Sequence, residues 1–262
     1  MQLIFFLLLI GLSASEQKSI KWPNGKKAAI ILTYDDGLQS QLNIAIPQLN
    51  QFKCKGTFFL TGNLNQKDIV RWGDAAKDGH ELGNHTLYHP CLSSVISSDT
   101  HYQSESYNAR IMLREISVMN NFLFAMDHKS STRTYAYPCS ETSVGGKDYT
   151  DTLAHSGLIK YARAGGDSNS VITQFSQLNK FVVPAWGFAN HPEGEQLISF
   201  VKKVQRAEGM GVFMFHGVGG DYLQVSADAH KKLLQYLNDQ QKDVWVATFR
   251  EVMDYITKET SK

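Results

Sequence analysis

The stretch that decides the fold is AAIILTYDDG, residues 28–37, in which an aliphatic run leads directly into two adjacent aspartates. Its first six residues are typical of a strand that is buried on both faces, as in parallel sheets. Carboxylates at the end of such a strand are costly to bury unless they bind a cation or share a proton. The segment therefore predicts a core strand that delivers Asp35 and Asp36 to a site. The alternative is a solvated turn, because Asp-Gly is also an ordinary turn sequence.

Strand-like and helix-like segments alternate from this stretch onward. Further strands are expected at 56–60, 80–83, 134–137, 158–162, 181–183, 211–215 and 244–248. Helices are expected at 39–52, 66–78, 104–124, 148–155, 193–208, 227–237 and 250–256. Repeated strand–helix units indicate parallel strands covered by helices, an α/β architecture. About seven such units close more naturally into a barrel than into an open sheet, with the chemistry after the carboxyl ends of the strands.

Composition excludes several classes of protein. The 262 residues are 42% hydrophobic, enough for a large core, and the net charge of +1 leaves no electrostatic footprint for nucleic acid. Three cysteines exclude a disulfide-dense mini-fold and a four-cysteine zinc site. No repeat or linker divides the chain, so residues 16–262 are expected to form one catalytic domain.

The first residues resemble an export signal. Residues 2–12 are almost wholly apolar, too short to span a bilayer, and small residues 13–15 follow. We therefore expect a signal peptide at 1–15 with cleavage near Ser15, a secreted or periplasmic protein, and no membrane insertion after cleavage. The alternative is a buried first element, because no Lys or Arg precedes the apolar run. In an oxidising compartment Cys91 and Cys139 could pair, leaving Cys54 free.

Two histidines follow the third expected strand. His85 and His89, at i and i+4, would lie on one face of a helical turn, so both rings could reach one ion. With Asp36 they would form a His₂Asp metal site that keeps a position for water. Thr86 stands where a zincin needs its glutamate, so that motif is excluded. The alternative is a chance histidine pair.

Two other strand ends carry candidate groups. His216 follows the strand at 211–215 and is placed to act as a general acid, unless it is a core histidine bonded to backbone. Pro138 forces a turn after the strand at 134–137, so the Cys139 N–H could stabilise an oxyanion. Alternatively, this is a plain strand-ending proline.

A serine nucleophile is a competing interpretation. Residues 166–168 read Gly-Asp-Ser, like the block of serine esterases, but they stand in the middle of the chain. The Asp-x-x-His that should follow late in such a chain is here Asp228-Ala229-His230, one residue short. This interpretation predicts sensitivity to serine-directed reagents and indifference to chelators.

The order of Thr-Tyr-Asp-Asp-Gly, His-Thr-x-x-His, Tyr-Pro and a strand-ending His resembles the NodB-like polysaccharide deacetylases, carbohydrate esterase family 4. The resemblance covers about residues 26–256. It implies a distorted (β/α) barrel of about seven parallel strands. It also implies a divalent metal, zinc before cobalt or nickel, and removal of acetyl groups from sugar polymers.

Carried over by position, the resemblance implies roles for individual residues. It implies the metal ligands Asp36, His85 and His89. It implies a catalytic base, a general acid and a backbone oxyanion donor at Asp35, His216 and Cys139. It also implies that Thr86 braces the histidine loop.

The chain departs from the family pattern in two places. The usual Arg-x-Pro-Tyr reads Ala-Tyr-Pro-Cys at residues 136–139, so the arginine that orients the base is missing there. Arg163, just after the strand at 158–162, could supply that charge. Trp186 is the candidate for the tryptophan of the acetyl pocket, with core packing as the alternative. Tyr137, Pro138 and Trp186 are the expected substrate-binding residues.

The expected substrate is an acetylated polysaccharide or oligosaccharide. N-acetylglucosamine polymers, chitin-like or peptidoglycan, come first, and O-deacetylation of acetylxylan comes second. A non-sugar amide hydrolase of the same fold is a third possibility. The alternative from a different functional class is a carbohydrate-binding module with an inactive site, which would lack at least one metal ligand. The sequence leaves the oligomeric state open.

Overall fold

The computed structural model describes residues 20–96, 102–129, 132–188 and 190–261. The predicted signal peptide at 1–15 lies outside the described residues. Within the described parts of the chain, no helix has the length and apolar character that a membrane crossing requires.

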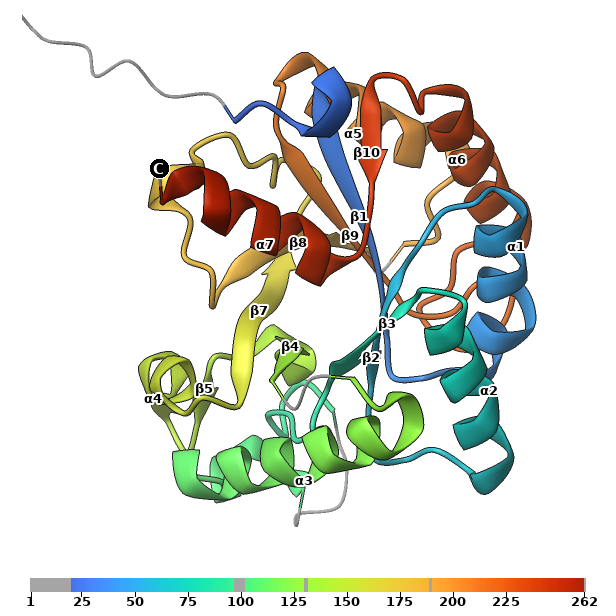
Figure 1. Ribbon diagram of the computed structural model, residues 1–262. Coiled ribbons are helices and arrows are strands. Elements are labelled where there is room, and N and C mark those ends of the chain that lie inside the picture. Colours follow the sequence, from blue (N-terminus) through green and yellow to red (C-terminus); the bar gives the residue numbers. More distant parts are fainter. Residues whose placement is uncertain (1–19, 97–101, 130–131, 189, 262) are drawn as a thin grey trace, which may run out of the picture.

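A parallel sheet closes into a barrel at the centre of the molecule (Figure 1). Its strands are β1 (Ala28–Asp35), β2 (Thr57–Leu60), β3 (Glu81–Asn84), β4 (Arg133–Ala136), β7 (Ile159–Gly166), β8 (Val183–Gly187), β9 (Met210–Phe215) and β10 (Val244–Val246). The order is β10-β1-β2-β3-β4-β7-β8-β9, and pairing of β9 with β1 closes the ring. The predicted barrel of about seven parallel strands is thereby confirmed. A small antiparallel pair, β5 (Ser143–Val144) and β6 (Lys147–Asp148), lies apart from it.

β1 has three partner strands. One edge pairs with β9 from Ala29 to Tyr34. The other edge pairs with β10 from Ala28 to Ile30 and with β2 from Thr33 to Asp35. β10 therefore lies beside the first half of β1 and is an eighth strand outside the closed ring of seven.

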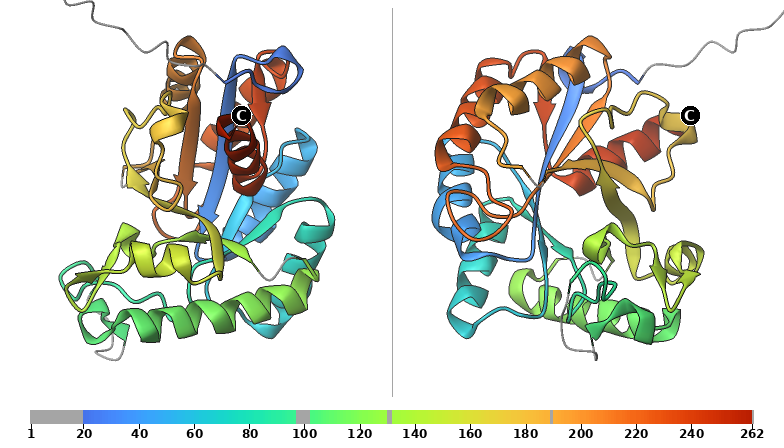
Figure 2. Two further views of the ribbon diagram at one scale, coloured as in Figure 1. Left: turned by 60° about the vertical axis from the view of Figure 1, so that its left-hand side comes forward. Right: turned by 180° about the vertical axis from the view of Figure 1, so that it is seen from behind.

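Helices surround the barrel, and Figure 2 shows them from two further sides. They are α1 (Ile46–Gln51), α2 (Gln66–Lys77), α3 (Ala109–Asp127), α4 (Thr150–His155), α5 (Gly194–Arg206), α6 (Ala227–Asp239) and α7 (Phe249–Thr260). A π-helix (Gln41–Ala45) precedes α1, and 3₁₀ turns occur at Pro23–Gly25, Ser104–Ser106, Pro138–Ser140 and Phe175–Gln177. α1, α2, α5 and α6 lie along one side of the molecule, and α3 runs along another (Figure 1).

The two faces of β1 belong to different parts of the core, because successive strand side chains point to opposite faces. Alternate residues from Ala28 to Tyr34 pack outward with residues of α1, α5 and α6. Ala29 and Ile31 point into the barrel and pack with the apolar face of α7. Asp35 has the inward parity, so the strand delivers its carboxylate to the barrel interior.

Most elements lie where the sequence predicts them, but the strand expected at 181–183 is displaced. β8 is Val183–Gly187 instead, and it contains a proline and a glycine, residues that weaken a strand pattern. β7 continues to Gly166 because Gly165 and Gly166 pair with Ala185 and Trp186 of β8.

The structure contains the cysteine pair that the sequence left open. Cys91 and Cys139 form a disulfide with Cα atoms 5.8 Å apart, and Cys54 is free and buried.

Candidate active site

Asp35 is the buried carboxylate at the carboxyl end of β1. Arg163 of β7 reaches across the barrel and donates from Nη2 to Asp35 Oδ2 at 2.5 Å. Burial raises the pKa of Asp35, but the nearby charges of Arg163, His85 and His216 outweigh that effect and hold the pKa below its ordinary value. Among the described residues Asp35 Oδ1 has no hydrogen-bond partner. A charged, unpaired oxygen in a buried position suits a group that accepts a proton from a ligand.

Three side chains converge beside Asp35. Asp36 Oδ1 lies 3.4 Å from His85 Nε2 and 3.5 Å from His89 Nε2, and all three donor atoms lie within 4.8 Å of one another. Two ligand atoms about 2.1 Å from one ion at a tetrahedral angle lie about 3.4 Å apart. The three side chains therefore fit a single divalent ion.

The histidines are held in the neutral form that metal binding needs. Burial lowers the pKa of His85 to about 3, and it also lowers the pKa of His89. His85 Nδ1 lies 2.8 Å from the carbonyl oxygen of Ala136. Because a carbonyl only accepts, Nδ1 carries the proton and the lone pair of Nε2 faces Asp36.

The loop that carries both histidines is not the predicted helical turn. Thr86 and His89 have φ angles of 65° and 51°, in the left-handed region. The backbone N–H groups of residues 86–89 donate to side chains, whereas in a helix they would donate to the carbonyls of preceding residues. Thr86 donates to Asn84 Oδ1, Leu87 and Tyr88 donate to Glu115 Oε2, and His89 donates to Thr86 Oγ1. The two rings converge through these anchors rather than through helical spacing, so that prediction was wrong in its geometry.

The second oxygen of Asp36 has its own neighbours. Tyr222, on the loop between β9 and α6, donates from its hydroxyl to Asp36 Oδ2 at 2.9 Å. His216 Nε2 lies 3.8 Å from the same oxygen. Burial, reinforced by the charge of Asp35, raises the pKa of Asp36 to about 6. No motif marks Tyr222 in the sequence, and sequence reasoning missed it.

A buried glutamine joins the ends of two strands. Gln41 Nε2 donates to the carbonyl oxygens of Asp35 at 2.6 Å and His216 at 3.0 Å. This side chain ties the strand that ends in Asp35 to the strand that leads into His216. The relative position of those two residues is therefore fixed by a residue that carries no sequence signal of its own.

Cys139 lies in the 3₁₀ turn after β4, with a φ angle of 50°. The neighbouring N–H groups of Ser140 and Glu141 donate to Tyr137 and Pro138 within the turn. The disulfide to Cys91 joins this turn to the histidine loop, and Cys91 Sγ lies 3.5 Å from His89 Nδ1. The backbone predicted to donate to an oxyanion is thus linked covalently to the segment just after His89.

The three residues predicted to bind substrate are buried or half-buried. Tyr137 is buried among Tyr135 and Tyr149, and its hydroxyl donates to the carbonyl of Phe181, so its side chain offers no surface to a substrate. Pro138 is also buried. Trp186 is half-buried against Phe188, Phe200 and Phe213.

A cleft of about 800 Å³ opens beside Asp36 and His89. The loops after β1, β2, β3 and β9 line it, and its wall includes Tyr88, Tyr102, Asp221 and Tyr222. Sequence reasoning did not identify Tyr88 or Tyr102, which come together only through the loop.

The serine-nucleophile alternative lacks its base. His230 is fully buried, with its two ring nitrogens 2.6 Å from the Tyr34 hydroxyl and 2.6 Å from Gln48 Oε1. It is therefore occupied in the core and cannot serve Ser168.

Curated relatives match parts of the chain. A peptidoglycan-N-acetylglucosamine deacetylase of Bacillus cereus is 42% identical over 72 residues, which are 26% of this chain and 26% of that protein. A chitooligosaccharide deacetylase of Azorhizobium caulinodans is 30% identical over 81 residues, 30% of this chain and 39% of that protein. Both matches span well under half of the relatives' length.

A solved structure and a family model extend the likeness. A candidate polysaccharide deacetylase from Mycobacterium smegmatis has the same fold, with a TM-score of 0.66, 16% identity, and coverage of 92% of this chain and 93% of that one. The family model described as polysaccharide deacetylase matches residues 23–155, which are just over half of the chain and include Asp35, Asp36 and both loop histidines. Arg163 and His216 lie beyond that match. The chain therefore belongs to the polysaccharide deacetylase family.

Proposed function

We propose that the protein is a metal-dependent deacetylase of an acetylated polysaccharide. Its first substrate class is N-acetylglucosamine polymer, with acetylxylan as the second candidate and a non-sugar amide as the third. The observation that carries the proposal is the spacing of Asp36, His85 and His89, which matches tetrahedral coordination, beside an unpaired oxygen of Asp35.

We propose Asp36, His85 and His89 as the residues that hold the ion, with zinc before cobalt or nickel. Two imidazoles and one carboxylate suit a catalytic zinc site that retains an open position. When bound, a divalent ion there supplies Lewis acidity that polarises a carbonyl and acidifies water.

The chain's own residues then share the proton transfers of hydrolysis. Asp35 accepts a proton from the attacking water through its free oxygen, while Arg163 holds the other oxygen. The Cys139 N–H donates to the developing oxyanion. His216, on the far side of Asp36 from the loop histidines, donates a proton to the leaving amine or alcohol. Of the predicted substrate-binding residues, the half-buried Trp186 remains proposed as a wall near the acetyl group, because Tyr137 and Pro138 are buried.

The proposal includes export of a single domain. Residues 1–15 would be removed as a signal peptide, which places residues 16–262 outside the cytoplasm. The disulfide between Cys91 and Cys139 supports this, because disulfides persist in oxidising compartments.

Substitution of Asp35 tests the proposed base. We expect Asp35→Asn to reduce acetate release from N-acetylglucosamine oligomers by at least about a hundredfold, while metal content measured by atomic emission stays that of the wild type. Asp74→Asn, a change of an exposed aspartate on α2, is the matched control. Full activity in Asp35→Asn would disprove the assignment of the base.

Chelation separates the metal-dependent mechanism from a serine esterase. We expect a chelator to abolish acetate release and zinc to restore it, with no effect of a serine-directed phosphonate. Parallel assays on chitooligosaccharides, peptidoglycan and acetylxylan then rank the substrates. Activity that survives complete metal removal would reject the proposed function.

A further inference from the structure

Beside the proposed metal site, the described part of segment 88–102 carries an exposed apolar surface that the mechanism does not use. Its large exposed apolar side chains are Tyr88, Leu92, Val95, Ile96 and Tyr102. We propose that Tyr88 and Tyr102 form a platform that binds a further sugar ring of a neutral N-acetylated glycan, adjacent to the ring that is deacetylated. The inference rests on the proposed function and names the substrate class of the same site.

The two tyrosines form one aromatic surface. Their ring centroids are 4.8 Å apart and their planes are inclined by 28°, so the rings are stacked. Tyr88 is 54% exposed and Tyr102 is 38% exposed. Each ring thus has one face against the other and keeps exposed surface, and aromatic surfaces of this kind receive the apolar face of a pyranose ring. A large contiguous patch of exposed apolar surface marks an interaction site or a ligand-binding groove.

The platform is held in place by buried groups. The backbone N–H of Tyr88 donates at 3.2 Å to Glu115 Oε2, and Glu115 Oε1 accepts from the Tyr107 hydroxyl at 2.5 Å. Gln103, next to Tyr102, forms an isolated β-bridge with Cys91, and the Ser104 N–H donates to the Cys91 carbonyl at 2.8 Å. Since Cys91 is also held by its disulfide, both tyrosines are positioned before a ligand arrives, which reduces the entropic cost of binding.

The platform is continuous with the proposed catalytic centre. Tyr88 directly precedes His89, and Tyr88, Tyr102, His89 and Asp36 line the same cleft of about 800 Å³. A cavity of this volume falls in the range of about 300–1,000 Å³ that encloses whole small ligands. It therefore has room for more than the reacting acetamido group.

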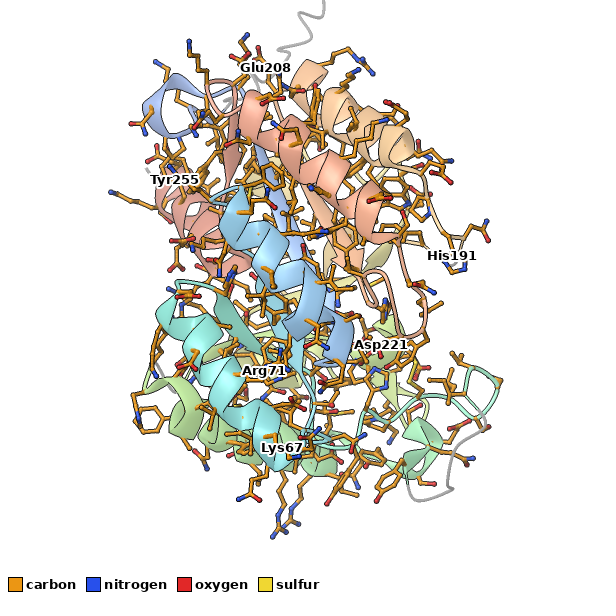
Figure 3. The ribbon with its side chains drawn as sticks, turned by 90° about the vertical axis from the view of Figure 1, so that its right-hand side faces the viewer. Lys67, Arg71, His191, Glu208, Asp221 and Tyr255 are labelled. Carbon is orange, nitrogen blue, oxygen red and sulfur yellow. A yellow bond between two sulfur atoms is a disulfide. The ribbon has the colours of Figure 1, made fainter. Side chains whose placement is uncertain are left out.

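The charges of the cleft favour a neutral chain. Apart from Asp36, the proposed metal ligand, its described lining includes the carboxylates Asp68 and Asp221 and the amides of Gln39, Asn63 and Asn65, but no lysine or arginine. Arg71 lies 3.6 Å from Asp68 outside that lining, and Figure 3 shows it on α2, away from the loop that carries Asp221. An anionic sugar would find no cationic side chain in this wall and would meet Asp221.

Kinetics with chains of two lengths test the platform. The probes are the dimer and the hexamer of N-acetylglucosamine, and the variants are Tyr88→Ala and Tyr102→Ala. We expect each to raise KM for the hexamer about tenfold and to lower the hexamer-to-dimer ratio of kcat/KM. Tyr102→Phe should retain the wild-type ratio. Phe124→Ala, which removes an exposed ring of α3 that is not part of the cleft lining, is the matched control.

A binding measurement keeps this test independent of turnover. In an Asp35→Asn background, titration calorimetry with the hexamer should show the same roughly tenfold loss on Tyr102→Ala. Wild-type protein that releases no acetate from any acetylated glycan, yet binds the hexamer through Tyr102, would reject the proposed function and retain the platform. Equal losses of kcat/KM for the dimer and the hexamer in the two alanine variants would overturn the platform. So would variants that bind the glycan as the wild type does but sediment differently, because the tyrosines would then serve an interface between protein copies.

A charged probe tests the choice of a neutral chain. The tetrasaccharide that alternates N-acetylglucosamine with N-acetylmuramic acid carries carboxylates, and we expect its kcat/KM to fall below that of the neutral tetramer. Asp221→Asn should narrow the difference in kcat/KM between the two tetramers, because it removes a negative charge that repels carboxylates. The amide oxygen of the new side chain can still accept from Ser40 N–H. A preference of the wild type for the anionic chain would contradict this part of the inference.

Discussion

At the scale of single residues, Arg163 illustrates how a departure from a motif is met by geometry. The position that usually carries arginine holds Ala136, yet Arg163 on the neighbouring strand β7 binds Asp35 from inside the barrel. The family resemblance could offer Arg163 as the charge that orients Asp35, but no local pattern fixes a contact between residues 128 positions apart. The guanidinium that holds Asp35 therefore comes from β7 rather than from β4.

Removal of this charge should shift the pH profile. With Arg163→Gln, the pKa of Asp35 rises because burial is no longer opposed by the guanidinium. Since the proposed base works only when ionised, we expect the acid limb of kcat/KM to move upward by about 1–3 pH units. Rates of acetate release between pH 4 and 9 measure this.

A second buried arginine controls for loss of packing. Arg133 is also buried and pairs with Asp127, on β4 and α3. We expect Arg133→Gln to destabilise the protein without moving the acid limb. An unchanged limb in Arg163→Gln would show that Arg163 does not set the ionisation of Asp35.

Tyr222 should act on metal affinity. Its hydroxyl holds Asp36 Oδ2, which leaves Oδ1 facing the two histidines. Loss of such an outer contact typically weakens metal binding by about 10–100-fold, so we expect that range for Tyr222→Phe in competition with a fluorescent chelator. Tyr236→Phe removes a hydroxyl that bonds Gln205 on the helices and should leave affinity unchanged. Equal affinity in the two variants would rule out this role.

At the scale of elements, aliphatic runs made the strands predictable and loops limited the prediction. β1, β2 and β9 coincide with runs such as residues 28–33 and 211–215, since strands buried on both faces require apolar residues throughout. The loop at His85–His89 was misjudged as a helical turn because its geometry depends on Asn84 and on Glu115 of α3. Hydrogen bonds across such distances leave no periodic pattern.

The disulfide should stabilise both loops that it joins. It closes a segment of 48 residues, for which the chain-entropy model gives about 4 kcal/mol of stabilisation. We expect Cys91→Ala/Cys139→Ala to lower the free energy of unfolding by roughly this amount in denaturant titrations. Cys54→Ala, which removes only a buried free thiol, should cost far less. A double variant as stable as the wild type would show that the pairing does not constrain the chain.

At the scale of the whole molecule, buried neutral histidines should make stability depend on pH. Burial lowers the pKa of His80 to about 4 and that of His230 to about 3. Each ring is bonded through both nitrogens, His80 to Gly56 N–H and Asn50, and His230 to Tyr34 and Gln48. Because the unfolded chain binds protons below about pH 6.5 while these rings do not, stability is full above that pH and declines as pH falls.

The decline can be measured by denaturant titration. Between pH 6.5 and 5 we expect each of the two histidines to cost about 2 kcal/mol of unfolding free energy. His230→Gln should flatten the decline by about that amount. His155→Gln, at an exposed position on α4, should leave the slope unaltered. A slope that is the same in all three proteins would contradict the assignment.

The candidate site was predictable where a motif lies at a strand end, and not where loops meet. Asp35, Asp36 and His216 stand at the ends of strands that the sequence predicts, so their convergence follows from parallel packing. Tyr222 and the Tyr88–Tyr102 platform depend on how loops return to the cleft. Loop paths are set by anchors such as Gln41 and Glu115, which no local pattern reveals.

The exchange of partners along β1 has a consequence for biosynthesis. β1 finds two of its neighbours in strands that a ribosome adds much later: Ala29 pairs with Met210, 181 positions on, and Ala28 pairs with Val244, 216 positions on. Until those residues emerge, a nascent chain keeps open sheet edges that other chains could join. The ring therefore cannot close before β9 has been synthesised, and cellular factors that bind extended chains can act on the open sheet until then.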